Sequence, residues 1–170
     1  MVFETSQRVK LYYLGKPADG FGWGVANTNL AKALGEFCEV VVETSNRTTF
    51  DAPVFVPVVD NSLKPLRKVK APRVIGYCFT EWPLAENAER ESRQYDVLFA
   101  GSSWNTDRLR AAGCKRVETL IQGVDLDLFT HQPPSERNGF VIFSGGKYEF
   151  RKGQYYFIAA LRRFMKQRQD

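Results

Sequence analysis

Short apolar runs separated by polar, glycine-containing segments recur along the chain. Such runs, when bounded by turn residues, are typical of strands buried in a parallel sheet. We expect strands at residues 9–14, 39–43, 54–59, 74–77, 97–100, 117–121 and 140–143. Helical spacing or composition between the runs predicts helices at residues 25–34, 84–95, 104–112 and 154–167. The alternation predicts an α/β protein with a mainly parallel sheet, flanking helices and a C-terminal β-α appendage.

The clearest single unit lies in the second half of the chain. The strand at 97–100 is followed by Ser102 and Ser103, and either hydroxyl can accept a hydrogen bond from a free amide at a helix start. Gly113 ends that helix as a C-terminal cap. The strand at 117–121 then completes a β-α-β unit with a right-handed crossover. By itself this unit predicts an α/β fold and no particular function.

Two loops that follow predicted strands carry candidate binding residues. Gly20, Gly22 and Gly24 lie between the first strand and a helix start, where backbone amides and the helix dipole suit an anion or a closely approaching sugar. A flexible turn explains the same glycines. Glu81 and Trp82 follow the carboxyl end of the fourth strand, the edge that faces the ligand crevice in an open parallel sheet. A carboxylate can bond sugar hydroxyls and an indole can stack on a sugar ring, but a helix-initial acid and a core tryptophan explain the pair equally well.

A dinucleotide site is the competing interpretation of the glycine-rich loop. Glu43 ends the second strand, near the position where a ribose-binding acid would lie. The glycine spacing does not fit, because the second glycine counted from Gly15 would fall on Pro17. We therefore do not expect NAD. Another α/β enzyme with a phosphate-bearing cofactor stays open as an alternative, supported by Glu43 alone.

The order of motifs is more informative than any one of them. Residues 95–129 contain five motifs in a fixed order. A strand is followed by Ser-Ser-Trp-Asn, by a helix that ends in Ala-Ala-Gly-Cys, by a second strand and by Gly-Val-Asp-Leu-Asp-Leu-Phe. This order resembles the family-four glycosyltransferases of GT-B fold, in which the stretch closes the acceptor-side domain. Residues 145–153, Gly-Gly-Lys-Tyr-Glu-Phe-Arg-Lys-Gly, are similar to the donor loop of that family. The resemblance covers most of the chain.

The resemblance implies a domain organisation. It predicts a Rossmann-like acceptor-side domain at residues 1–130, which is half of a GT-B fold. A proline-rich linker would follow at 131–138, and residues 139–170 would begin the donor-side domain. The family also uses a pair of donor-binding glutamates in a later segment, which these residues do not contain. We therefore expect residues 1–170 alone not to transfer sugar.

The resemblance further implies a function and a set of site residues. The reaction would transfer a sugar, with retention of configuration, from a nucleotide-sugar donor to a glycan, lipid or small-molecule acceptor, without metal or other cofactor. The acceptor side would consist of Gly20, Gly22, Gly24, Glu81, Trp82 and Ser102. Gly146, Lys147 and Lys152 would bind the donor diphosphate. Lys147 occupies the position where the family usually has an arginine. An ammonium group therefore replaces a planar guanidinium group, which can bind a phosphate through two hydrogen bonds.

A binding half or split subunit that catalyses nothing is the alternative to a transferase. The last predicted helix bears on this question, because Phe157, Leu161, Phe164 and Met165 share one face with Ile158 beside them. An amphipathic helix of this kind requires an apolar partner. We expect the rest of a donor-side domain, or another chain, to supply it.

Composition sets further limits. The chain has 170 residues, of which 44% are apolar and 25% charged, as in ordinary globular domains. No run is long enough to cross a bilayer and no signal-peptide core is present, so we expect a cytoplasmic protein. Cys38, Cys78 and Cys114 lack metal-ligand spacing and predict reduced, mostly buried thiols. The single histidine, His131, argues against a zinc site or a histidine-based triad.

The net charge of +5 is unevenly distributed. The two basic clusters consist of Lys64, Arg67, Lys68, Lys70 and Arg73, and of Arg162, Arg163, Lys166 and Arg168. Both suit phosphate-bearing partners or peripheral contact with an anionic membrane, although a solvated face explains each cluster taken alone. Because no nucleic-acid-binding motif accompanies the charge, nucleic acid is not expected as a partner.

Overall fold

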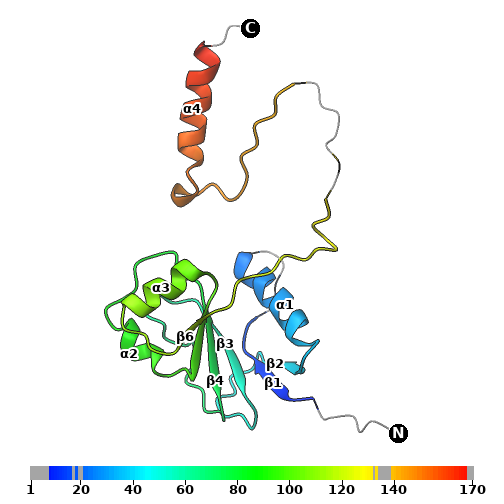
Figure 1. Ribbon diagram of the computed structural model, residues 1–170, viewed down its shortest axis with the longest axis vertical. Coiled ribbons are helices and arrows are strands. Elements are labelled where there is room, and N and C mark those ends of the chain that lie inside the picture. Colours follow the sequence, from blue (N-terminus) through cyan, green and yellow to red (C-terminus); the bar gives the residue numbers. More distant parts are fainter. Residues whose placement is uncertain (1–7, 17, 19–20, 132, 134–138, 168–170) are drawn as a thin grey trace. The chain divides into compact units, whose positions relative to one another are not determined.

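The computed structural model describes residues 8–16, 18, 21–131, 133 and 139–167. They belong to two compact units, Met1–Asp125 and Leu126–Asp170. The first unit contains a six-stranded sheet in the order β2-β1-β3-β4-β5-β6, and every neighbouring pair is parallel (Figure 1). The strands are Lys10–Tyr13 (β1), Glu39–Val42 (β2), Val54–Val58 (β3), Val74–Cys78 (β4), Val97–Ala100 (β5) and Val117–Thr119 (β6). This arrangement confirms the predicted Rossmann-like α/β fold.

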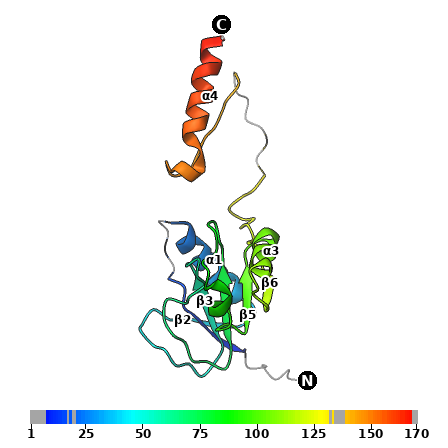
Figure 2. The ribbon, with the colours of Figure 1, turned by 90° about the vertical axis from the view of Figure 1, so that its left-hand side faces the viewer.

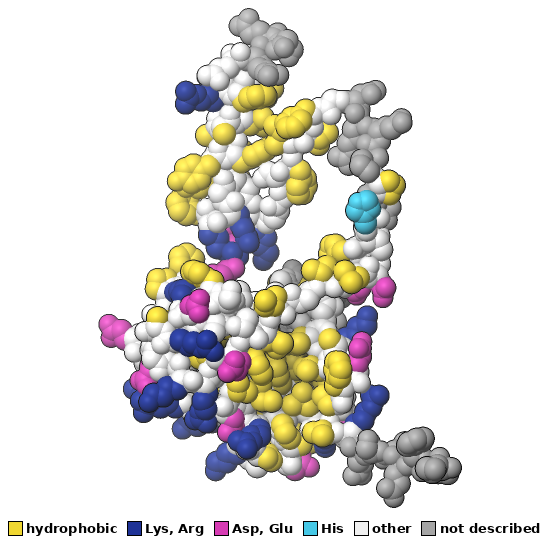
Figure 3. Space-filling view, viewed as in Figure 1, with side chains coloured by type: hydrophobic (Ala, Val, Ile, Leu, Met, Phe, Trp, Pro, Cys, Tyr) yellow, Lys and Arg dark blue, Asp and Glu magenta, His cyan; other side chains and the backbone are white. Residues whose placement is uncertain are grey.

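The helices of the first unit cover the two faces of the sheet unequally. Helix α1 (Gly22–Leu34) packs through Leu30 and Leu34 on one face (Figure 2). Helices α2 (Ala88–Ser92) and α3 (Ser103–Ala111) pack on the other face, through Ala88 and Leu109. Figure 3 shows hydrophobic side chains gathered over the sheet beside α1. Among the described helices of the first unit, α1 is thus the only one on its face of the sheet.

Strand β3 shows why these apolar runs fold as they do. All five of its residues are buried, as expected for a central strand covered on both sides. Val54, Val56 and Val58 belong to the core cluster on the α3 face. Phe55 points to the α1 face, where its ring stacks on Tyr13 with centroids 5.3 Å apart. Side chains that alternate across the strand therefore build two separate cores.

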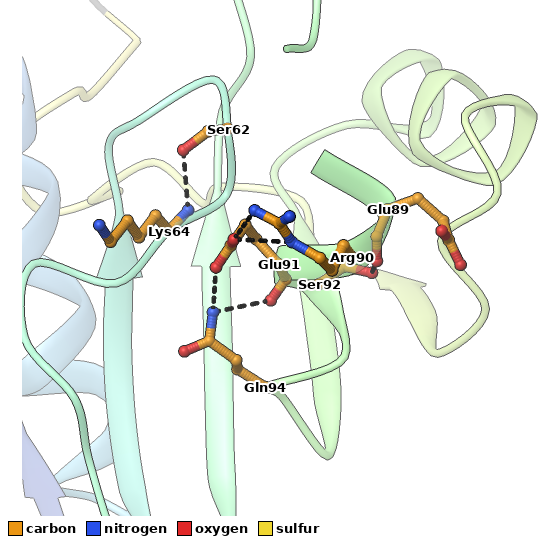
Figure 4. Close-up of polar contacts among 7 residues, drawn as sticks. All are labelled: Ser62, Lys64, Glu89, Arg90, Glu91, Ser92 and Gln94. Atoms are coloured by element: carbon orange, nitrogen blue, oxygen red, sulfur yellow. Dashed lines mark hydrogen bonds and ion pairs between the residues drawn. The ribbon is translucent and has the colours of Figure 1, made fainter. Parts of the chain in front are cut away.

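Helix α2 is shorter than the helix predicted at residues 84–95, because a turn occupies residues 86–87. Helical spacing in the sequence predicts ion pairs from Glu86 to Arg90 and from Glu89 to Arg93, and of these the second forms, at 2.7 Å. Arg90 pairs at 2.8 Å with its neighbour Glu91, whose other oxygen accepts a bond from Gln94 (Figure 4). The hydrogen bond from Arg90 is the main reason that the pKa of Glu91 is lowered.

The second unit differs from the predicted β-α appendage in one respect. Its helix α4 (Gln154–Gln167) spans the predicted residues and follows a 3-10 turn at Phe150–Lys152. The strand predicted at 140–143 is wrong: those residues are not in a strand, and Phe140 and Phe143 are 89% and 86% exposed. A strand needs a neighbour for its backbone groups, and no described segment pairs with this one.

Only part of the apolar face predicted for α4 is covered. Phe157 and Leu161 are half-buried, whereas Ile158, Phe164 and Met165 are exposed. Across the described residues, no helix combines the length and the apolar character that spanning a bilayer would require.

Candidate functional site

The carboxyl edge of the sheet is the candidate site. In an open parallel sheet, ligands bind outside the carboxyl ends of the strands, next to the point where the strand order reverses. Here β2 and β3 lie on opposite sides of β1, so the reversal falls between β1 and β3. The segments that leave β1, β4 and β5 meet at this edge, and they contain the predicted acceptor-side residues.

The segment that leaves β1 is fixed by a buried polar pair. The Tyr13 hydroxyl donates a 2.9 Å hydrogen bond to Oδ1 of Asn27, and Asn27 Nδ2 donates to the Lys16 carbonyl at 3.3 Å. Burial raises the pKa of Tyr13, so its phenol stays neutral and donating. A Cβ on Gly15 would come within 2.3 Å of the Tyr13 ring, which explains the glycine at this turn. Helix α1 therefore holds the start of the glycine-rich loop.

The three predicted loop glycines have different environments. Gly24 is buried in the first turn of α1, and a Cβ there would lie 2.5 Å from the carbonyl oxygen of Ala18. Its lack of a side chain permits the loop to approach the helix. Gly22 is exposed, with nothing within 4 Å of its would-be Cβ. Gly20 lies outside the described residues.

An aromatic row connects the glycine-rich loop to the exit of β4. The rings of Trp23 and Phe79 meet edge to face with centroids 4.8 Å apart, and Phe79 meets Tyr77 at 5.0 Å. Any Cβ on Gly101, at the end of β5, would collide with the Phe79 ring. Phe79 thus lies against both α1 and the exit of β5, and places α1 beside the segment that carries Glu81 and Trp82.

The exits of β4 and β5 are tied together by a second buried polar pair. The hydroxyl of Thr80, which is 2% exposed, donates a 2.6 Å hydrogen bond to Oδ1 of Asn105. The backbone N–H of Asn105 donates to the Ser102 hydroxyl at 3.2 Å, which makes Ser102 the N-cap of α3. Of the two serines considered for this cap, the structure selects Ser102. Its hydroxyl is therefore engaged in holding the helix start.

Arg108, on helix α3, forms hydrogen bonds that hold the segment after β4 in place. Its guanidinium donates to the carbonyls of Thr80 at 3.2 Å and Trp82 at 3.0 Å. The same group lies 4.5 Å from the centroid of the Trp104 ring, as a cation–π contact. Trp82 and Trp104 are 59% and 58% exposed, and Glu81 is also exposed. Neither predicted acceptor residue on this segment belongs to the core.

This arrangement suits recognition of a neutral, hydroxyl-rich ligand. Exposed indoles offer faces on which a sugar ring can stack, and a nearby carboxylate can accept bonds from its hydroxyls. No cluster of potential metal ligands occurs among the described residues. Cys78 lies at the end of β4, but burial raises its pKa to about 12, so it is a protonated thiol and a poor nucleophile. The described groups at this edge are thus suited to binding a ligand rather than to reacting with it.

The predicted donor-loop residues lie in the second unit. Gly146 has a φ of +103°, which favours glycine, and Gly153 closes the 3-10 turn with a φ of +72°. The Lys147 carbonyl accepts a 2.8 Å bond from Nε2 of Gln154, whose Oε1 is buried without a hydrogen-bond partner among the described residues. The side chains of Lys147 and Lys152 are exposed. The first turn of α4 therefore holds the loop by its backbone and leaves both lysines accessible.

A shallow depression of about 320 Å³ occurs elsewhere, lined by residues that include Arg93, Gly113 and Arg116. Arg116 immediately precedes β6, so the depression lies at the amino edge of the parallel sheet. It contains none of the predicted site residues.

Sequence reasoning missed the side chains that hold the carboxyl edge together, namely Asn27, Thr80, Asn105 and Arg108. A local signal existed for Asn27, because it precedes Leu30 and Ala31 by three and four residues on the face of α1 that packs on the sheet. A polar residue on an apolar stripe predicts a buried hydrogen bond. No comparable signal marks Thr80, whose partner is 25 residues away.

Comparison of the chain with protein-family models, with curated proteins and with solved structures found no significant match.

Proposed function

We propose that residues 1–125 form the acceptor-binding half of a retaining GT-B glycosyltransferase. The observation that carries the proposal is the exposure of Trp82, Trp104 and Glu81 at the carboxyl edge of a parallel sheet, where they follow β4 and β5. Stacking surfaces and a carboxylate in that position fit a saccharide acceptor. The order of motifs along the chain supports the same assignment.

On this proposal, the chain's residues act by binding and orientation. Trp82 and Trp104 would stack on sugar rings, and Glu81 would accept hydrogen bonds from sugar hydroxyls. Arg108 would act through the backbone, by fixing the segment that carries both Glu81 and Trp82. In the second unit, Lys147 and Lys152 would neutralise the diphosphate leaving group of a nucleotide-sugar as its charge increases.

The experiment is a calorimetric titration of the protein with a panel of mono- and oligosaccharides. Trp82→Ala should weaken binding of the best saccharide about tenfold, because one stacked ring contributes about 1.4 kcal/mol. Glu81→Gln, which keeps the shape and removes the charge, should weaken it less. Since both side chains are exposed, thermal stability should not change. Absence of saccharide binding by the wild type would contradict the proposal.

A binding module that holds a saccharide without transferring it is the second candidate function. The exposed indoles favour it, because a stacking surface binds sugars without any chemistry. Two results together would favour this second candidate. The chain would bind saccharides but not nucleotide diphosphates, and Lys152→Ala would leave its saccharide affinity unchanged.

A further inference from the structure

The connections from β2 to β3 and from β3 to β4 contain no helix, and they run side by side. Thr49 and Lys70 form a parallel bridge between them. The Phe50 amide donates to the Lys70 carbonyl at 2.8 Å, and the Lys70 amide donates to the Thr48 carbonyl at 2.8 Å. These backbone bonds fix the C-terminal end of the β3–β4 connection against the first unit.

The N-terminal end of the same connection is fixed by Leu63. Its side chain is fully buried, and its carbonyl accepts a 2.9 Å hydrogen bond from the Tyr95 hydroxyl. Leu63 has a φ of +62°, which a leucine adopts only when its surroundings enforce it. Residues 64–70, which we call the basic ridge, are therefore held at both ends.

Exposure alternates along the basic ridge. Lys64, Leu66, Lys68 and Lys70 are exposed, whereas Pro65, Arg67 and Val69 are half-buried. Val69 packs against the core, and Arg67 donates a hydrogen bond to the Ser45 carbonyl. Figure 4 shows the Lys64 side chain extending away from the polar cluster of α2. The ridge thus displays three lysines with a leucine among them.

This displayed face is cationic, and its acidic neighbours lie only at its N-terminal end, where Asp60 and Glu91 are close enough to Lys64 to interact with it electrostatically. The sequence contains no acidic residue between Asp60 and Glu81. Within the described part of the chain, none of Lys64, Lys68 and Lys70 forms an ion pair. Leu66 is 79% exposed, which leaves an apolar side chain in water between cations. A solvated loop explains the lysines and the leucine taken separately, whereas a bilayer interface suits cations that flank an exposed apolar side chain.

We propose that the basic ridge docks the protein on an anionic membrane surface. Lys64, Lys68 and Lys70 contact lipid headgroups, and Leu66 inserts at the boundary with the acyl chains. One apolar side chain, or a few lysines, binds a membrane only weakly when it acts alone. The ridge combines apolar insertion with electrostatic attraction to anionic lipids. Single-stranded nucleic acid fits less well, because the ridge contains no aromatic side chain for base stacking. This proposal does not depend on the sugar-transfer proposal.

The magnitude expected for each group follows from its chemistry. One lysine near an anionic bilayer raises the partition coefficient about fivefold, so two neutralised lysines should lower it about 25-fold. Insertion of Leu66 should contribute about tenfold. The lysine contribution should disappear at high salt, and the leucine contribution should persist.

Co-sedimentation with vesicles tests the proposal on the full chain. Vesicles of phosphatidylcholine alone are compared with vesicles containing phosphatidylserine, at low and high salt. We expect binding to the anionic vesicles only, about 25-fold weaker for Lys64→Gln with Lys68→Gln, and about tenfold weaker for Leu66→Ser. The matched control is Arg162→Gln with Arg163→Gln on α4, which also removes two cations and should leave binding unchanged. Unaltered thermal unfolding establishes that each variant is folded.

Three results would overturn the docking surface. The first is equal binding to neutral and anionic vesicles. The second is a loss of binding with the α4 variant and not with the ridge variants. The third is tighter binding to a single-stranded RNA oligonucleotide than to the anionic vesicles at the same salt concentration.

Discussion

The Thr80 hydroxyl donates a 2.6 Å hydrogen bond to Oδ1 of Asn105, and both side chains are buried where β4 and β5 leave the sheet. This bond joins the segment that carries Glu81 and Trp82 to the first turn of α3, where Trp104 lies. Arg108 repeats the connection one helical turn later by binding the Thr80 and Trp82 carbonyls. Two adjacent strand exits are thereby held as one surface.

Thr80→Val tests the importance of that bond. Valine keeps the shape and leaves the Asn105 oxygen buried without a donor, so the free energy of unfolding should fall by about 1–3 kcal/mol. Urea denaturation measures it. Thr49→Val, at an exposed threonine, is the control and should change stability by less than about 0.5 kcal/mol. Equal stability of the two variants would show that the Thr80 bond contributes nothing.

Gly22 and Gly24, in the same turn of α1, provide a matched pair of positions for testing how closely the preceding loop packs on the helix. Gly24→Ala places a Cβ 2.5 Å from the Ala18 carbonyl oxygen and should destabilise the protein by about 1–3 kcal/mol. Gly22→Ala meets open space and should leave stability unchanged or raise it by up to about 1 kcal/mol, through helix propensity. Thermal unfolding compares them. If Gly24→Ala were as stable as Gly22→Ala, the loop would not approach the helix as described.

Buried tyrosines predict the alkaline limit of stability. Burial raises the pKa of Tyr77 to about 12, above the ordinary value near 10. The unfolded chain therefore loses this proton first, and the stabilisation is complete below about pH 10 and is lost as the pH rises toward 12. Tyr77→Phe should make the decline in unfolding free energy over this range shallower. Tyr148→Phe, at an exposed tyrosine, is the control. Identical slopes for Tyr77→Phe and wild type would contradict the assignment.

If residues 145–153 form a donor loop as proposed, they should give weak, salt-sensitive binding of a nucleotide diphosphate such as UDP or ADP. Lys152→Ala should weaken this binding, because it removes an exposed cation from the loop. Lys166→Ala, on the last turn of α4, removes the same charge outside the loop and serves as the control. Calorimetry at low salt provides the measurement. Equal affinities of wild type and Lys152→Ala would remove Lys152 from the site.

Much of the fold was predictable because its signals are local. The predicted strand at β5 and the predicted helix α4 have the observed bounds, and the other strands of the sheet differ by one or two residues at one or both ends. The prediction of a strand at 140–143 was wrong because an apolar run gives no information about which segments lie beside it in the fold. Whether such a run becomes a strand depends on a neighbour that supplies hydrogen bonds.

The candidate site was less predictable, for a related reason. Glu81, Trp82 and Ser102 were identifiable because each lies within five residues of the end of a predicted strand. The groups that hold them come from distant parts of the chain, as in the Tyr13–Asn27 and Thr80–Asn105 pairs, 14 and 25 residues apart. Periodicity within one element contains no information about such contacts. The tertiary structure was needed to find Arg108 between two tryptophans.

The most direct test of the carboxyl edge as a saccharide-binding site uses the three tryptophans of the chain, Trp23, Trp82 and Trp104. Their indole N–H groups give separate NMR signals, which can be assigned with single Trp→Phe variants. We predict that a saccharide titration shifts the Trp82 and Trp104 signals together, at one shared affinity, and shifts Trp23, which packs on Phe79, less. Shifts confined to Trp23, or none at saturating saccharide, would contradict the assignment of Trp82 and Trp104 as the acceptor-binding surface.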